Sequence, residues 1–439
     1  MDSVSPEKDE TAGPAQPSFR EAFLFWLKLG WISFGGPAGQ IAIMHQELVD
    51  RKRWISNDRF LHALNYCMLL PGPEAQQLAT YIGWLLHRTR GGIAAGVLFV
   101  LPSVFILFTL SYIYVVFGTL PWVAAIFTGL KAAVLAIVLA AVIKIGRKSL
   151  KNNLLIAIAV LSFVATYFLN VPFPALILTV GIIGAIGSQL APELFMAGNK
   201  SGAAAPLVDR NGEHSRTTSP ARNLKLLAIF IALWGVPFIG LHALLPGSIF
   251  ATEAFFFTKA AFLTFGGAYS LLGYIAQAGV EQYGWLTSLQ MMDGLGLAET
   301  TPGPLIMVVQ FVGFLAGWNH SAALGPVLGA VTGSLVATYF TFLPSFMFIF
   351  LGAPYVERLA GNSRMSAALA TITPAVVGVI LNLGVWFGTH VLFPVEGFAW
   401  FSAILAIAAF CLLQLLKIGI IPVIAGSGIL GLAWHLLGL

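Results

Sequence analysis

Long apolar stretches follow one another along almost the whole chain, from Phe19 to the C-terminus. Each is about 20 residues long, the length that an α-helix needs to cross a hydrocarbon layer roughly 30 Å thick. Hydrophobic residues make up 58% of the 439 residues and charged residues only 9%, whereas a soluble domain carries about a quarter charged residues. The sequence therefore predicts an all-α polytopic membrane protein and excludes a water-soluble globular fold.

The polar segments lie at the start and in the middle of the chain. Residues 1–18 are charged and contain no apolar run behind a basic flank, so we expect a disordered tail and not a signal peptide. Residues 191–222 mix charged, small and polar residues and are predicted to form a cytoplasmic linker. The net charge of +5 is too diffuse for nucleic-acid binding and is informative only through its distribution over the loops.

Cysteine and histidine give no support for a metal site or a cofactor. Cys67 and Cys411 are far apart in apolar segments, so we expect both to be packing residues. The eight histidines show no ligand spacing, and most fall near the ends of apolar segments. No catalytic constellation is visible either, so we expect a protein that is not an enzyme.

One helical unit occurs twice in the chain. Glycine and proline motifs recur in the same order at an offset of 231 residues, because 265 − 34 and 302 − 71 are both 231. Further along, the offset becomes 242, which implies an eleven-residue insertion. The matching segments are Phe34-Gly35-Gly36 with Phe265-Gly266-Gly267, Pro71-Gly72-Pro73 with Pro302-Gly303-Pro304, Leu101-Pro102-Ser103 with Leu343-Pro344-Ser345, and Ala133-Val134 with Ala375-Val376.

We divide the chain into two transporter repeats, 19–190 and 247–439. Between them lie the linker and an extra transmembrane helix, 223–246, that has no counterpart in the first repeat. If each repeat makes an even number of crossings, this helix turns the second repeat upside down. Two inverted-topology repeats are typical of secondary transporters.

Basic residues in the loops agree with this inverted arrangement. By alternation they fall on one side, which the positive-inside rule assigns to the cytoplasm together with the N-terminus. They are Arg88 and Arg90, Lys144 to Lys151, the linker, Arg358 with Arg364, and Lys417.

The cluster Arg51-Lys52-Arg53 would lie outside if residues 19–48 formed one full crossing. Hairpins that turn back at Gly35-Gly36 and at Pro71-Gly72-Pro73 return it to the cytoplasm. The equivalent residues 282–284 carry no basic charge, as expected for an outward location. We therefore favour broken or re-entrant helices in each repeat, although full spans stay open.

The paired breaks point to a binding site. A Pro-Gly-Pro inside an apolar segment is tolerated in lipid only where protein or a water-filled cavity satisfies the backbone. Matched breaks in inverted repeats are typical of a substrate site near the membrane midplane, and we favour this over two packing kinks. The N-terminus of a half-helix offers unpaired NH groups and suits an anion. The candidate ligands are Ser33, Gly35, Gly36, Gly72, Gln76, Gln77, Thr264, Gly266, Gly267, Thr300, Thr301, Gly303 and Gln310.

Lys28 and Lys259 occupy equivalent positions in apolar segments. A lysine at the centre of a membrane helix costs about 2.5 to 3.5 kcal/mol and is seldom kept without a role. Direct attraction of an anion is one role, and snorkelling to the membrane surface is the other. Lys131 lies mid-segment as well, but its counterpart is Thr373, so it ranks lower.

Glu74 and Glu299 flank the breaks but are not repeat equivalents. A permanent negative charge would repel an anion, so our hypothesis is that one of them carries a proton during transport. For Glu74 the alternative is an acid at a helix start, which the helix dipole stabilises.

These motifs resemble the CHR-type chromate ion transporters in their long, two-domain form. The resemblance covers both halves and rests on Phe34-Gly35-Gly36-Pro37, Leu70-Pro71-Gly72-Pro73-Glu74-Ala75-Gln76-Gln77, Thr264-Phe265-Gly266-Gly267 and Thr301-Pro302-Gly303-Pro304. It implies chromate efflux across the bacterial inner membrane, coupled to the proton-motive force.

The sequence leaves several alternatives open. Chromate and sulfate have similar shape and charge, so a sulfate or other oxyanion transporter is the second reading, and export is not distinguished from uptake. An intramembrane enzyme acting on a lipid-borne substrate is the competing class. A homodimer in the lipid bilayer also stays open.

Overall fold

The computed structural model describes residues 17–191, 220–265, 267–352, 363–395 and 397–438. Most of these residues are helical, and the described ranges contain no strand. Six of the helices are long and apolar enough to cross a membrane. The predicted all-α polytopic class is therefore confirmed. Most of the predicted tail and linker, and Gly266, lie outside the described residues.

The first repeat opens with short helices and continues with long ones. Its short helices have 10 to 14 residues, fewer than the about 20 needed to cross a bilayer, which favours hairpins over full spans. The elements are α1 (Phe19–Ile32), α2 (Gly36–His45), the π-helical turn η1 (Gln46–Arg51), α3 (Asn57–Cys67), α4 (Glu74–Phe117), α5 (Pro121–Ser149), α6 (Asn153–Tyr167) and α7 (Phe173–Leu190).

The second repeat follows the same order, and even its π-helical turn lies at the same offset of 231 residues. Gly284, with φ +61°, likewise stands at the position of Arg53, with φ +52°. The elements are α10 (Ile249–Phe262), α11 (Ala268–Ala276), η2 (Gln277–Gln282), α12 (Ser288–Thr300), η3 (Leu305–Met307), α13 (Val308–His320), α14 (Gly325–Gly352), α16 (Ser363–Leu392), α17 (Trp400–Gln414) and α18 (Ile420–Leu436).

Helix α4 corresponds to the separate helices α13 and α14. Its backbone leaves the helical region at His87 and Arg88, where it folds back. Small residues let the two arms approach closely in both repeats. Gly83 lies against Gly91 in the first repeat, and Gly313 lies against Gly333 in the second.

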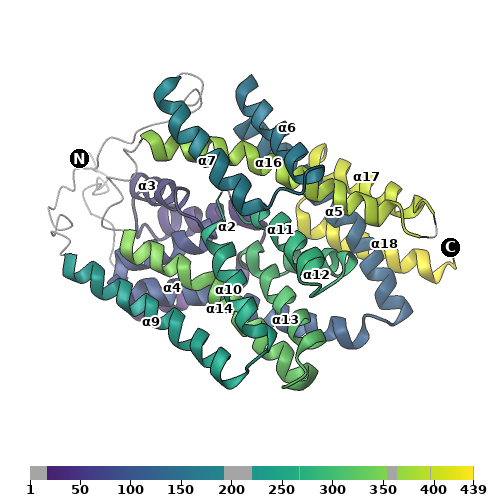
Figure 1. Ribbon diagram of the computed structural model, residues 1–439, viewed down its shortest axis with the longest axis horizontal. Coiled ribbons are helices and arrows are strands. Elements are labelled where there is room, and N and C mark those ends of the chain that lie inside the picture. The colour runs from purple at the N-terminus through teal and green to yellow at the C-terminus, as the bar shows by residue number, and fades with distance from the viewer. Residues whose placement is uncertain (1–16, 192–219, 266, 353–362, 396, 439) are drawn as a thin grey trace, which may run out of the picture.

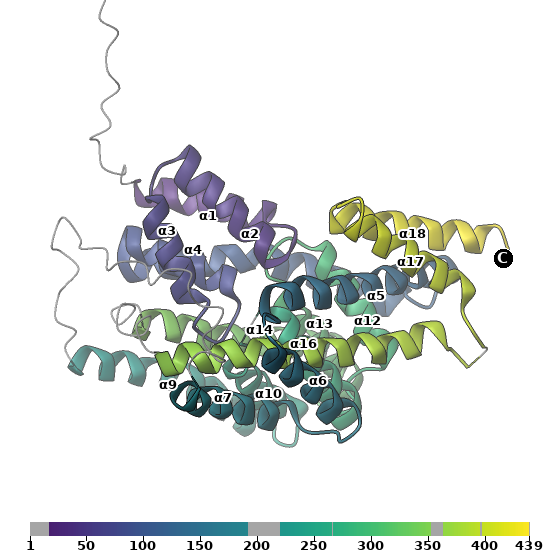
Figure 2. The same cartoon turned by 90° about the horizontal axis from the view of Figure 1, so that it is seen from above.

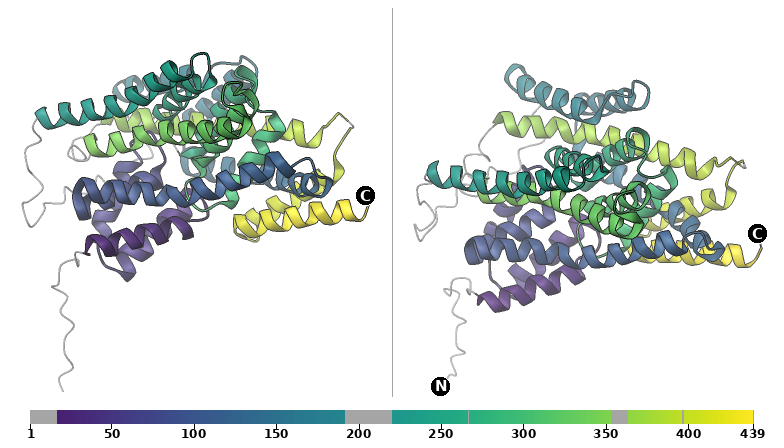
Figure 3. Two further views of the ribbon diagram at one scale, coloured as in Figure 1. Left: turned by 90° about the horizontal axis from the view of Figure 1, so that it is seen from below. Right: turned by 60° about the horizontal axis from the view of Figure 1, so that its bottom comes forward.

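The two repeats exchange their last helices. The hairpin α6–α7 packs against α16 of the second repeat, and α17–α18 packs against α5 of the first. Figures 1 and 3 show α6 and α7 beside α16, and α17 and α18 beside α5. The core is therefore one intertwined bundle, and neither repeat forms a closed unit of its own.

Helix α9 (Pro220–Leu244) is the extra apolar helix between the repeats. It lies at the edge of the bundle (Figure 1). Only 6% of its most apolar 18-residue stretch is buried inside the protein. It contacts α10 and α14, where the Tyr339 hydroxyl donates to the Leu233 carbonyl 2.7 Å away. Helix α9 thus covers one flank of the second repeat.

Candidate functional site

Each repeat contributes a break after its first helix. Helix α1 ends at Ser33, whose hydroxyl donates to the Leu29 carbonyl at 2.6 Å, and Thr264 donates to Ala260 at 2.8 Å after α10. Glycines with positive φ angles follow, Gly35 at +86° and Gly267 at +95°. Side chains rarely adopt this backbone conformation, which explains the glycines of these motifs.

The breaks cross between the repeats. The Gly72 NH donates to the Thr264 carbonyl at 2.8 Å, and the Gly303 NH donates to the Ser33 carbonyl at 2.7 Å. Each Pro-Gly-Pro break is therefore bonded to the Gly-Gly break of the opposite repeat. The sequence placed these residues in one site, and the structure brings them together in two symmetry-related clusters. Both glycine NH groups are used in these bonds.

Two serines that sequence reasoning missed complete the clusters. The Ser103 hydroxyl donates to the Pro302 carbonyl, and a Cβ atom on Gly72 would lie 2.7 Å from Ser345 Oγ. A Cβ atom on Gly303 would overlap Ser103 Oγ. The recurrence of Leu-Pro-Ser in both repeats was the available signal, but it did not reveal which break each serine meets.

Buried amides surround the clusters. Gln77 donates to the Pro71 carbonyl at 2.7 Å, Gln310 donates to Val104 at 2.8 Å, and Gln40 donates to both Ser33 and Gly303. Because each NH₂ group faces a carbonyl, the amide oxygens have no donor in the part of the chain that the structure describes, and neither does that of Gln76. Buried acceptors of this kind require a donor from water or ligand.

The half-helices after the breaks begin without side-chain caps. Pro73 precedes α4, and Pro304 precedes η3 and α13. Their first-turn NH groups have no partner within the helix, so these ends attract negative charge. Gly35 and Gly36 start α2 in the same way. Thr300 and Thr301 instead donate to Leu297 and Ala298 of their own helix.

The two carboxyl groups lie in different surroundings. Glu74 is half-buried, and its Oε1 would lie 3.8 Å from a Cβ atom on Gly267. Glu299 is buried and accepts a hydrogen bond from the Tyr269 hydroxyl at 2.7 Å. Both therefore lie close to the second break, Glu74 from the first repeat and Glu299 from the second.

Two exposed lysines one turn apart on α5 act electrostatically on these carboxyl groups. The charge of Lys148 acts on Glu74, and the charge of Lys144 acts on Glu299. Sequence reasoning used both lysines only as loop charges. Their spacing of four residues places them on one face of a helix.

Lys28 and Lys259 lie elsewhere. Lys28 is exposed between Leu24 and Trp31, which are about half exposed. Lys259 is half-buried in the equivalent apolar stripe, with its Nζ 5.6 Å from the centre of the Tyr274 ring. The stripes point away from the buried faces that carry Ser33 and Thr264. These positions suit the snorkelling alternative.

Lys131, which ranked below Lys28 and Lys259 as a candidate, forms an ion pair. Its Nζ lies 3.7 Å from Asp293 Oδ1, and the Tyr114 hydroxyl donates to Asp293 Oδ2 at 2.9 Å. Asp293 belongs to α12, whereas Lys131 and Tyr114 belong to α5 and α4. This pair of a partly exposed lysine and a buried aspartate joins the second-repeat hairpin to the first repeat, and the counterparts Thr373 and His62 carry no such charge pair.

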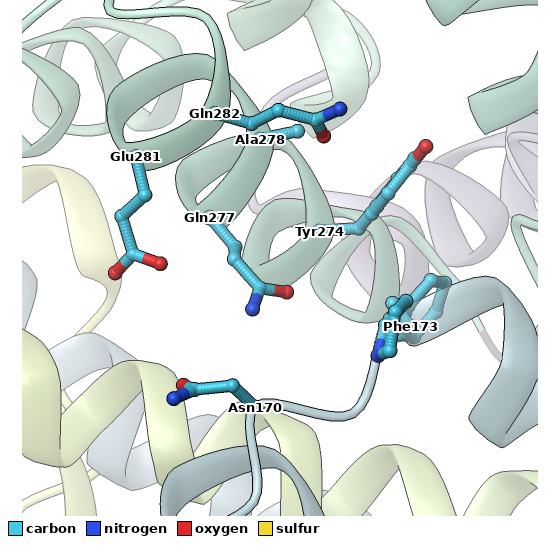
Figure 4. Close-up of a pocket in the computed structure, with 8 residues that line it drawn as sticks. Asn170, Phe173, Tyr274, Gln277, Ala278, Glu281 and Gln282 are labelled. Atoms are coloured by element: carbon cyan, nitrogen blue, oxygen red, sulfur yellow. The ribbon is translucent and has the colours of Figure 1, made fainter.

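A cavity of about 240 Å³ lies away from the breaks. It is lined by Asn170, Phe173, Tyr274, Gln277, Glu281 and Gln282, among others, and Figure 4 shows the Gln277 amide pointing into it. Tyr274 is shared between this cavity and Lys259. Within the described residues, no group of three or more His, Cys, Asp or Glu side chains is arranged to hold a metal ion.

Known proteins match most of the chain. The chromate transporter family profile matches residues 20–185 and 251–432, which leaves out the linker and α9. A chromate transport protein of Cupriavidus metallidurans is 28% identical over 98% of both chains. One from Pseudomonas aeruginosa is 32% identical over 84% of this chain and 81% of its own. A probable chromate transport protein of Synechococcus elongatus is 28% identical over 87% of both.

No solved structure matches the chain. The family match nevertheless covers both repeats and includes all four breaks that the structure joins into crossed clusters. The chain therefore belongs to the chromate transporter family.

Proposed function

We propose that this protein exports chromate across the bacterial inner membrane and draws on the proton-motive force. The observation that carries the proposal is the crossed pair of breaks, because each cluster combines backbone from both repeats. A site shared in this way changes whenever one repeat moves against the other. Alternating access to a central site is the mode of transport expected for inverted repeats.

In this proposal, backbone NH groups and glutamine side chains bind the dianion. The uncapped starts of α4 and α13 supply NH groups and the positive end of the helix dipole. Gln76, Gln77, Gln310 and the hydroxyls of Ser33 and Thr264 surround the ion. The amide oxygens without donors accept hydrogen bonds from water that enters with it, or from a protonated oxyanion.

Lys144 and Lys148 supply the positive charge that Lys28 and Lys259 do not bring to the breaks. On the exposed face of α5 they attract anions at the cytoplasmic mouth and guide them past Glu74. An arriving dianion competes with Glu74 and Glu299 for the lysines. A carboxyl group that carries a proton does not compete in this way, which agrees with the hypothesis that one of the two carries a proton during transport.

The direct experiment is chromate accumulation in bacterial cells with and without the protein. Expressing cells are expected to hold several-fold less chromate, and the difference should vanish when the proton gradient is collapsed. Excess sulfate distinguishes the substrates: if sulfate abolishes the difference, the site takes oxyanions in general. Higher accumulation in expressing cells would reverse the proposed direction.

Orientation and assembly belong to the same proposal. The N-terminus lies in the cytoplasm, and α9 carries the chain to the outer side before the second repeat. Labelling of single cysteines introduced at Arg90 and at Gly284 from outside intact cells tests this, because only the second is expected to react. The bilayer is the only other partner required, and a homodimer is not needed for the site.

A further inference from the structure

Unpaired polar groups line one flank of the α10–α14 pair. Among the described residues, neither carboxyl oxygen of Glu253 on α10 has a hydrogen-bond partner, and the hydroxyls of Ser334, Thr341 and Ser345 on α14 likewise have none. All four residues are at most 1% exposed. Buried polar groups are nearly always satisfied in proteins, so four on two adjacent helices require an explanation.

The register of the two helices places these groups in one row. Thr264 and Ser345 both lie at Gly72. One and a half turns earlier, Trp234 hydrogen-bonds Thr258 on α10 at 2.8 Å and packs on the Phe340 ring of α14. The helices therefore run in the same direction. Glu253 and Ser334 each precede Thr264 and Ser345 by eleven residues, or about 16 Å of helix, so they lie at the same level.

Helical periodicity places the row on a single side. At about 100° per residue, Ser334, Thr341 and Ser345 fall within about 40° of one another, and Glu253 and Thr264 within about 20°. Trp234 and Tyr339 mark the opposite flank, which α9 covers. Helix α13 closes the inner side, where Gly313 packs on Gly333 and Ala337. The row is therefore enclosed by protein and ends at the Gly72 break.

The first repeat lacks this row. At the offsets of 231 and 242 residues, Glu253, Ser334 and Thr341 correspond to Ala22, Gly92 and Phe99. Only the last member has a polar counterpart, Ser103, which donates to Pro302. Packing of the same helix pair therefore does not require these polar groups, and their presence is specific to the second repeat.

Within the described residues, no charged side chain pairs with Glu253. Glu253 is fully buried, although titratable side chains occur on every helix packed against α10: Arg222, Lys225 and His242 on α9, Tyr269 and Tyr274 on α11, His320 on α13, and Tyr339 on α14. On α10 itself, Lys259 lies over Tyr274. An isolated carboxylate inside protein is very costly, whereas a carboxyl group that holds a proton is tolerated.

Hydroxyls both donate and accept, so with water they pass protons along a chain.

We propose that Glu253 is a proton-binding site, and that Ser334, Thr341 and Ser345 lead the proton from the start of α10 to the break at Gly72. The inference rests on the proposed transport function and deepens it by assigning the route of the coupling proton. The proton enters from the end of the bundle where residues 245–248 begin α10. At each step one O–H bond forms as another breaks, so no further reactant is required.

Two measurements on purified protein in liposomes test the route. The first is exchange of labelled chromate for unlabelled chromate, which requires no net proton movement. The second is proton movement driven by a chromate gradient, followed with a trapped pH dye. We expect Glu253→Gln to reduce proton movement by at least about tenfold and to leave exchange within about twofold. Glu281→Gln, an exposed carboxyl of the same repeat, is the matched control and should change neither.

Infrared spectroscopy tests Glu253 independently of transport. The band of a protonated carboxyl group should disappear in Glu253→Gln and persist in Glu281→Gln. The double variant Ser334→Ala with Thr341→Val keeps side-chain volume; it should retain the band and slow proton movement. Unchanged proton movement in both the Glu253 and the double variant would overturn the route. Absence of chromate exchange in the wild type, with the infrared result intact, would instead remove the proposed function.

Discussion

The two hairpins that carry the breaks are built alike but pack differently. In the second repeat, α12 packs against α5 and α11 packs against α16. Within the described residues, the equivalent helices α3 and α2 do not pack in this way against α16 and α5. Figure 2 shows α1, α2 and α3 together at one side of the bundle, with α12 inside it.

Exposure follows the same difference. Leu272 and Ala276 of α11 are buried, whereas their equivalents in α2, Ile41 and His45, are partly exposed. The sequence is nearly symmetric at the breaks, but the conformation is not. We infer that the site opens beside the first hairpin, near Lys144 and Lys148, and is closed beside the second. Exchange of these two arrangements would move the opening across the membrane.

The largest expected loss of chromate export comes from substitutions in the crossed breaks, which both hairpins help to form. Gly303→Ala and Gly72→Ala each place a Cβ atom against buried side chains at φ +100° and +129°. Both should reduce chromate export by at least about tenfold, because strain and overlap at one break each cost on the order of 1–3 kcal/mol. Export assays and thermal unfolding in detergent measure this. Gly235→Ala on α9, where a Cβ atom meets nothing, is the control.

If only one of the two glycine variants lost export, the crossed clusters would not be equivalent. Adding Ser103→Ala to Gly303→Ala removes the overlapping hydroxyl and should restore part of the activity. The same addition should do nothing for Gly72→Ala, whose neighbour is Ser345.

An intermediate effect is expected from the contact that only the second hairpin makes. Asp293→Asn leaves Lys131 without its partner in a buried site, and loss of one member of a buried ion pair costs about 3–5 kcal/mol. We expect a lower unfolding temperature and faster labelling of a cysteine placed on α12. The combination Lys131→Met with Asp293→Leu should recover stability. Equal stability of wild type and Asp293→Asn would show that the pair does not hold the second side closed.

The smallest effect on chromate export should come from Lys144 and Lys148, on the side where we infer that the site opens. Lys144→Gln and Lys148→Gln remove exposed charges, so chromate export should need a several-fold higher chromate concentration at low salt, with little change at high salt. Arg147→Gln, also exposed on α5, is the matched control. Loss of maximal rate without a change in half-saturating concentration would place the lysines in a later step.

Local sequence signals predicted the breaks because glycine and proline impose their backbone geometry wherever they stand. They did not reveal the crossing of Gly72 to Thr264, since such pairing depends on how the repeats dock. The role first given to Lys28 and Lys259 shows a second limit. Repetition suggested function, but the structure places Lys28 in an exposed stripe between Leu24 and Trp31, four and three residues away. Glu253 escaped notice because it has no counterpart in the first repeat.

The crossed backbone bonds also constrain how the protein is made. Gly72 is synthesised 192 residues before Thr264, because 264 − 72 is 192. On emerging from the ribosome, the first half therefore has a broken helix whose partner does not yet exist, in a bilayer that offers no substitute donor or acceptor. Biogenesis must keep this half in a hydrated or chaperoned environment until the second half has been inserted, and truncated chains should be degraded.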